Sequence, residues 1–204
     1  MRLHYHPLSS YSRKVRSAML HRGDAHDTKT IDVFRGELRT PEYQTLSPFA
    51  KMPVLVTDHE TLFESTSIIE WLEERGPRVL IPAGNERVAR QFDRLGDLYI
   101  LAPVSALWWR EKSDEGQKAP DTIRRAWAVF EKPLAQSPFV AGESLTLGDL
   151  SAAIGTDYAV RLGVEPSSTI RAWMERCFAV PAVRQSLDEA MPFIAPGLAM
   201  RHGD

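Results

Sequence analysis

The sequence has a single cysteine, Cys177, so no disulfide within the chain can stabilise the fold. It has no apolar run long enough to cross a bilayer, and Met1 leads into polar residues rather than into a signal-peptide core. Acidic and basic residues nearly balance at a net charge of -2, which is not the basic footprint of a nucleic-acid-binding protein. We therefore expect a cytoplasmic protein that binds neither nucleic acid nor membrane.

Metal-ligating and nucleophilic residues are also sparse. The six histidines have no spacing typical of metal ligands, so we expect no metal site. Cys177 lies in an apolar helical segment and is interpreted as a small core residue rather than a nucleophile. What the chain does have is length, because 204 residues with 43% hydrophobic content can build a substantial core.

The first 76 residues predict a small α/β domain. Apolar and polar residues alternate in four short segments, which predicts strands at residues 2–6, 28–34, 52–56 and 61–63. Helical spacing follows Ser12 and Glu64, and Thr40 with Pro41 is typical of the start of a short helix. The order of strands and helices is that of a thioredoxin-like domain.

The rest of the chain predicts an all-helical domain. Residues 77–84 contain two prolines and a glycine and are interpreted as a linker, and residues 85–204 contain no convincing strand. Helices are expected at residues 87–111 with a break at Pro103, then 122–134, 168–178 and 182–191, whereas the polar stretch 113–120 is expected to be a loop. A further helix begins at Thr146, with Asp149 at its third position and a Leu145–Leu150 staple. The fold class is thus α/β plus all-α.

One polar turn stands out between the first strand and the first helix. Ser9, Ser10, Tyr11 and Ser12 lie beside the free N–H groups of the first helical turn. Such a turn can hold an anion, and a thiolate is an anion. The alternative is that one serine caps the helix and the others are solvated.

Four motifs together resemble those of the cytosolic glutathione S-transferase family over the whole chain. Residues 9–16 resemble the serine motif of the zeta class and the Ser-Pro-Phe motif of the tau class, as in serine-type bacterial members. Residues 47–55 resemble the family's segment with a cis-proline, and Glu64-Ser65 resembles its Glu-Ser pair. Thr146 to Asp149 resembles the N-cap of its helical domain.

The chain departs from the family pattern at a few positions. Ala50 replaces the usual glycine, which implies a slightly different loop path, and Ser10 stands where many relatives have proline. Thr66 and Ser67 are more polar than the usual residues after Glu-Ser. None of these departures removes a group that the chemistry needs.

The resemblance implies glutathione as co-substrate and Ser9 as the residue that stabilises its thiolate. Ser10 is the alternative, because a one-residue shift in the loop exchanges the two; Tyr11 is expected to pack its ring under the helix start and Ser12 to cap. To lower a thiol pKa from about 8.5 by two units, the site must favour the thiolate over the thiol by about 2.7 kcal/mol. A hydrogen bond to a charged group supplies about 1.5–3 kcal/mol and a helix N-terminus about 0.3–1 kcal/mol, so one serine suffices.

The resemblance also implies how the rest of the peptide is held. Met52 and Pro53 would present main-chain groups to the cysteinyl part, Ser65 would meet the γ-glutamyl carboxylate, and Glu64 would meet its ammonium. Lys51 and Arg39 are candidates for the glycine carboxylate, and for each the alternative is a solvated surface charge.

The second substrate is expected between the domains. The candidates to line its pocket are Leu8, Tyr99, Pro103, Trp108 and Trp109. We expect that neighbouring Trp108 and Trp109 cannot both face one pocket.

The leading hypothesis is a homodimeric glutathione S-transferase acting on a small hydrophobic electrophile. A second is a glutathione-dependent isomerase of the zeta type acting on maleyl-like diacids, for which Arg13 or Arg110 would have to point into the pocket. A third is a binding module of the same fold without catalysis.

Overall fold

A four-stranded mixed sheet forms the centre of the N-terminal domain. The computed structural model describes residues 1–200; the last four residues of the range 85–204 lie outside the described part. The strands run in the order β2-β1-β3-β4, namely Asp27–Thr30, Arg2–Tyr5, Val54–Val56 and Thr61–Phe63. β1 pairs in parallel with β2 and antiparallel with β3, and β3 pairs antiparallel with β4. β2 ends four residues earlier than predicted, because the chain turns after Thr30, where the Val33 N–H donates to the Ile31 carbonyl.

Three helices and a short 3-10 turn complete this domain. The helices are α1 (Ser10–Arg22), α2 (Pro41–Leu46) and α3 (Ser65–Glu74), and the turn η1 spans Glu37–Arg39. α1 starts earlier than predicted, since Ser9 rather than Ser12 is its N-cap: the Ser9 hydroxyl accepts the Ser12 N–H at 3.3 Å. The thioredoxin-like order of strands and helices is confirmed.

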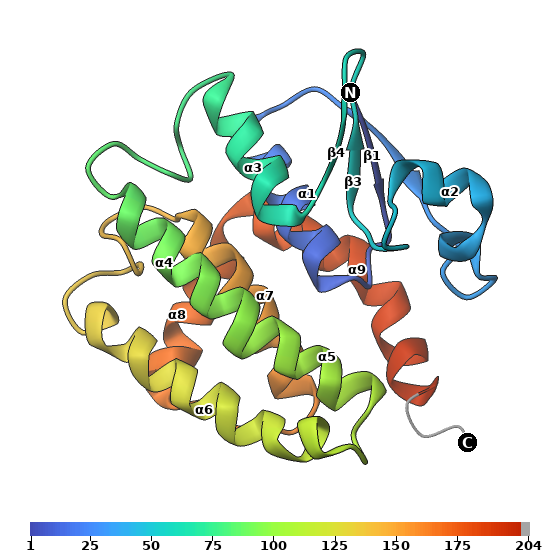
Figure 1. The fold of residues 1–204 in the computed structure, drawn as a ribbon. Helices are drawn as coiled ribbons and strands as arrows, with labels where there is room; N and C mark the ends of the chain where they lie inside the picture. Colours follow the sequence, from blue (N-terminus) through green and yellow to red (C-terminus); the bar gives the residue numbers. More distant parts are fainter. Residues whose placement is uncertain (201–204) are drawn as a thin grey trace.

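Within residues 85–200 the second domain contains helices and no named strand, as predicted. Its elements are α4 (Glu86–Gly96), the π-helical turn η2 (Asp97–Leu101), α5 (Ala102–Trp109), α6 (Asp114–Leu134), α7 (Leu147–Arg161), α8 (Ser168–Ala179) and α9 (Pro181–Met200). Figure 1 shows the sheet on one side of the molecule and α4, α6 and α8 on the other. α1 packs against α3 of its own domain and against α7 and α9 of the helical domain. The helix that carries the polar turn is therefore held between the two domains.

Two predictions about this domain are wrong and one is confirmed. Residues 113–120 are not a loop, because Ser113 caps the Gly116 N–H at 3.1 Å and two acidic residues follow at the positive end of the helix dipole. The helix predicted at 182–191 continues to Met200 through two prolines. The capping at Thr146 is confirmed, since the Asp149 carboxylate accepts the Thr146 main-chain N–H at 2.9 Å.

The linker between the domains is anchored by a buried carboxylate. Glu73 accepts the main-chain N–H groups of Leu80 and Ile81 at 3.1 and 2.9 Å. The same carboxylate pairs with Arg22 of α1 at 2.5 Å. Within residues 1–200, no helix is both long and apolar enough to span a membrane.

Candidate active site

A cleft with a volume of about 940 Å³ lies between the sheet domain and the face formed by α4, η2 and α5. Eight of the ten residues predicted for the site line it: Ser9, Ser10, Lys51, Met52, Pro53, Glu64, Ser65 and Trp108. Arg39 and Tyr99 are outside it. The starts of α1, β3 and α3 therefore meet at one cavity, although they lie more than ten residues apart in the sequence.

Ser9 lies where α1 begins. Its backbone is extended, with φ -72° and ψ 120°, and its oxygen accepts the Ser12 N–H. Among the described residues its hydroxyl hydrogen has no acceptor, so it is free to donate into the cleft. Ser10 lines the same cavity, and the choice between the two serines for a thiolate stays a prediction.

The other two residues of the turn differ from each other: Ser12 lies outside the cleft, whereas Tyr11 also lines it. Ser12 is fully buried, and its hydroxyl oxygen accepts the main-chain N–H of His6 at 3.5 Å. Ser12 therefore does not cap the helix. The Tyr11 ring packs against the core, as predicted, and its hydroxyl lies 3.5 Å from the Asp97 carbonyl. Burial, reinforced by the Asp97 carboxylate, raises the pKa of Tyr11 well above its usual value. The phenol is therefore neutral at physiological pH and does not supply a base.

The loop before β3 forms the middle of the cleft wall. The Met52–Pro53 peptide is cis, as the family resemblance implies. The loop is fixed by two hydrogen bonds, from the Lys51 N–H to Ser47 Oγ at 3.0 Å and from the Tyr43 hydroxyl to the Lys51 carbonyl at 2.9 Å. Ala50 has φ 51°, so alanine here adopts the left-handed conformation that glycine favours.

The start of α3 forms the third part of the wall. Ser65 is buried at the first helical position, and Glu64 is exposed beside it. Glu64 has φ 70° and ψ 115°, a conformation that costs a non-glycine residue about 1–3 kcal/mol. Its side chain makes no capping hydrogen bond, so helix capping does not account for this residue. Both the free N–H groups of α3 and the Glu64 carboxylate remain available to a ligand.

The helical domain forms the opposite wall. Leu98, Ala102, Ser105 and Trp109 line it at helical spacing. Tyr99 is one position further around the helix than Leu98, which places it outside the cleft. Pro103 is also outside it.

Both neighbouring tryptophans border the cavity, contrary to expectation, although one of them is a core residue, as the same expectation held. Trp108 is 5% exposed and belongs to the core, whereas Trp109 is 57% exposed. Their ring centroids are 5.9 Å apart at an interplanar angle of 40°. One indole therefore belongs to the buried wall and the other to its solvent-facing margin.

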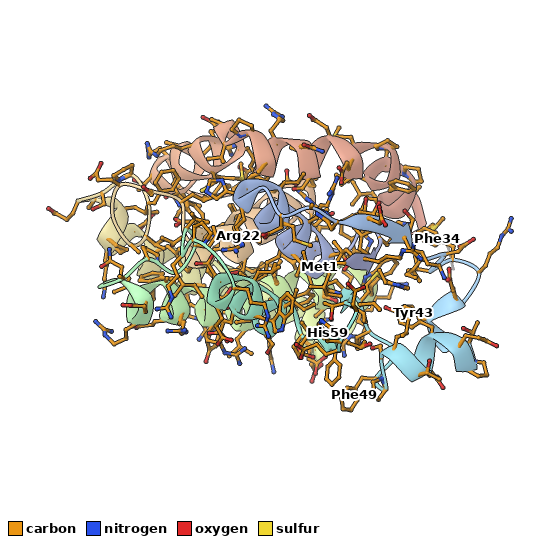
Figure 2. All side chains as sticks on the ribbon, turned by 90° about the horizontal axis from the view of Figure 1, so that it is seen from above. Met1, Arg22, Phe34, Tyr43, Phe49 and His59 are labelled. Atoms are coloured by element: carbon orange, nitrogen blue, oxygen red, sulfur yellow. The ribbon has the colours of Figure 1, made fainter. Side chains whose placement is uncertain are left out.

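Several lining residues carry no sequence signal that would have singled them out. Phe34 and Phe49 are exposed, and Figure 2 shows them with Tyr43 on the side of the molecule that carries α2. His6, Arg94 and Asp97 also line the cavity. Leu98 is exposed on the same wall. Because each belongs to an ordinary strand, loop or helix, only the packing of the domains brings them to the cleft.

Charged side chains of both signs, including Asp97, line the cleft on the helical-domain side. Arg94 and Arg110 both line the cleft, and Arg110 pairs with Glu115 at 2.5 Å. Arg13 points away from it: the side chain is 1% exposed and pairs with Asp157 at 3.2 Å. Within residues 1–200, no group of three or more His, Cys, Asp or Glu side chains is placed to hold a metal ion.

Comparison with known proteins gives family matches over both domains. Residues 8–75 match the family model of the glutathione S-transferase N-terminal domain, and residues 95–181 match that of the C-terminal domain. Glutathione S-transferase 1 of Dianthus caryophyllus is 30% identical over 161 residues, covering 74% of this chain and 73% of the relative. The chain belongs to the glutathione S-transferase family.

Two further relatives bear on fold and chemistry. The structure of Gtt2 from Saccharomyces cerevisiae is similar to this chain with a TM-score of 0.82 at 22% sequence identity. The match covers 91% of this chain and 100% of the Gtt2 chain. This likeness confirms the fold class of a thioredoxin-like domain followed by a helical domain. The maleylacetoacetate isomerase of Dictyostelium discoideum is 26% identical over 204 residues, covering 92% of this chain and 93% of the relative.

Proposed function

We propose that this protein is a glutathione S-transferase in which Ser9 stabilises the glutathione thiolate for attack on a small hydrophobic electrophile. The observation that carries the proposal is the convergence of Ser9, Met52–Pro53 and Glu64–Ser65 on one cleft. These segments offer a hydroxyl donor, main-chain groups and an anion-binding helix start, which match the thiol, the peptide and the γ-glutamyl end of glutathione.

The chemistry needs no metal and no formal base. The thiol proton passes to solvent, and the sulfur then forms a bond to the electrophilic carbon as the leaving group departs with its electron pair. Ser9 donates a hydrogen bond to the sulfur anion, and the N-terminal end of α1 adds the favourable end of its dipole. Ser10 is the alternative donor in the same role.

The remaining site roles follow from position along the cleft. Lys51 lines the cleft and we assign it to the glycine carboxylate, whereas Arg39 lies outside the cleft. Leu8 and Trp108, with Trp109 and Leu98, form an apolar surface for the electrophile. We assign residues 1–76 to glutathione binding, 77–84 to the linker and 85–204 to the second substrate. We also propose a cytoplasmic homodimer, as the family resemblance implies.

One observation favours a second function. Arg110 lines the cleft, as an isomerase acting on a maleyl-like diacid requires, and Arg94 adds a second cation there. Two relatives, including the Dictyostelium protein, are named as maleylacetoacetate isomerases. A diacid that is isomerised without consuming glutathione would support this function over transfer. A binding module without catalysis is the third possibility, and absence of any turnover despite glutathione binding would support it.

The test compares variants of the polar turn. Wild type is expected to bind glutathione at millimolar concentration and to transfer it to a chlorinated nitroarene. Ser9→Ala should lower kcat/KM by about 100-fold, the loss of thiolate expected if the thiol pKa rises by two units. It also removes a helix cap worth about 1 kcal/mol, so Ser9→Asn, which keeps a cap, serves as the stability control.

Three outcomes separate the readings. No glutathione binding by wild type rejects both enzyme functions. An unchanged rate in Ser9→Ala moves the thiolate role to Ser10, which Ser10→Ala then tests. If Ser9→Asn is as stable as wild type but inactive, the activity is lost because the serine hydroxyl is missing, and not because α1 is destabilised.

A further inference from the structure

Tyr158 connects the helical domain to the peptide that precedes Ser9. It lies on α7, and its hydroxyl donates to the Leu8 carbonyl at 2.8 Å across 150 residues of sequence. The side chain is 2% exposed, yet it borders the cleft. The catalytic turn is thus held from the opposite domain by one buried hydrogen bond.

The Tyr158 ring is itself closely confined. The Arg13 guanidinium lies 4.9 Å from its centroid, and the Trp108 ring meets it edge-on at 5.4 Å. Arg13 is held in turn by Asp157, the residue before Tyr158 on α7, at 3.2 Å. Packing from both domains therefore holds the Tyr158 ring in place, with its hydroxyl directed at the Leu8 carbonyl.

Within residues 1–200, the Leu8 carbonyl is the one main-chain group of the turn whose hydrogen-bond partner comes from the other domain. The Leu8 N–H donates to His6 Nδ1 at 3.1 Å, and the Ser9 N–H donates to the His6 carbonyl at 3.0 Å. Without the Tyr158 hydroxyl the plane of the Leu8–Ser9 peptide can shift, and the Ser9 Cα, which belongs to the same plane, shifts with it and moves the Ser9 hydroxyl.

We propose that Tyr158 is a positioning residue for the thiolate: by holding the Leu8 carbonyl toward α7, it keeps the Ser9 hydroxyl aimed at the sulfur. This inference rests on the proposed transferase function. Burial raises the pKa of the Tyr158 phenol, so it stays protonated and can serve as the donor throughout the working pH range. Tyr158 acts through Ser9 and does not touch the reacting atoms.

The test is Tyr158→Phe in the full chain, which removes the hydroxyl and keeps the ring. The readouts are the pH profile of kcat/KM and the ultraviolet absorbance of the bound thiolate. We expect the bound thiol pKa to rise by about one unit and kcat/KM near neutral pH to fall about tenfold. Glutathione affinity, measured by calorimetry at a pH below the bound-thiol pKa of both proteins, where glutathione binds as the neutral thiol, should change by less than about threefold, because the contacts at the start of α3 are untouched.

Thr156→Val is the matched control on the same helix. The Thr156 hydroxyl is fully buried and accepts the Trp127 Nε1–H at 2.9 Å, toward α6 and away from the cleft. This variant should lower the melting temperature without moving the thiol pKa. A merely structural role for Tyr158 predicts the same result for Tyr158→Phe.

The failures are distinguishable. If wild type neither binds nor transfers glutathione, the proposed function fails and this inference falls with it. If wild type is active and the thiol pKa is unchanged in Tyr158→Phe, the inference alone is overturned. Should Tyr158→Phe not fold, Arg13→Lys carries the test: it keeps a charge beside Asp157 but loses the flat contact with the ring. We expect a smaller pKa rise in the same direction, and no rise overturns the inference.

Discussion

Lys14 Nζ lies 2.6 Å from Asp93 Oδ1, and both side chains are completely buried where α1 of the first domain meets α4 of the second. Asp97, at the margin of the cleft, is a second partner of Lys14 at 2.9 Å. Thr66 of α3 accepts a hydrogen bond from Lys14 at 2.8 Å and donates to Asp93 at 2.7 Å. This network joins the helix that carries Ser9 to the helix that begins with Ser65 and to the opposite wall.

The first prediction concerns the stability that depends on this network. Lys14→Met should lower the free energy of unfolding by about 3–5 kcal/mol, because it leaves two buried carboxylates without their cation. Urea denaturation measures the loss. Lys29→Met is the control: its pair with Glu37 is exposed, and its removal should cost less than about 1 kcal/mol. Equal losses in the two variants would contradict a special role for the buried lysine.

The second prediction concerns stability in mild acid. Burial lowers the pKa of both His4 and His6 from 6.5. Between pH 6.5 and each lowered value the unfolded chain binds more protons than the folded one, so stability falls as the pH is lowered through that window. Each histidine contributes a slope of at most about 1.4 kcal/mol per pH unit.

His4→Leu tests this pH dependence. His4 Nδ1 is buried without a hydrogen-bond partner in the described part of the chain, so the substitution removes the titration without breaking a bond. The unfolding free energy of this variant should decline less steeply below pH 6.5 than that of wild type. Parallel curves for the two proteins would show that His4 titrates alike in the folded and unfolded states.

The third prediction separates two basic residues proposed for the glycine carboxylate. Lys51 lines the cleft and Arg39 does not. Lys51→Ala should raise KM for glutathione about two- to fivefold with kcat nearly unchanged, the range expected for an exposed ion pair. Arg39→Ala is the matched control and should leave both constants unchanged. A rise in KM for Arg39→Ala would mean that the loop around η1 reaches glutathione in the complex.

Local signals in the sequence were enough to predict most of the elements. The cap at Thr146 and the helix start at Thr40–Pro41 each depend on residues within a few positions of one another. Where local signals competed, the prediction was wrong: the polar stretch 113–120 is typical of a loop, yet it begins with a good cap. The same competition among neighbouring serines made Ser12, rather than Ser9, the predicted cap of α1.

The sequence by itself determined the order of elements, the two-domain fold class and the motifs at Ser9, Met52–Pro53 and Glu64–Ser65. These features follow from short-range patterning and from motif likeness. Only the tertiary structure decided that Tyr99 lies outside the cleft, that Arg13 points away from it, and that Tyr158 reaches Leu8. The physical reason is that such contacts join segments up to 150 residues apart. Their geometry depends on how the two domains pack, which no local propensity encodes.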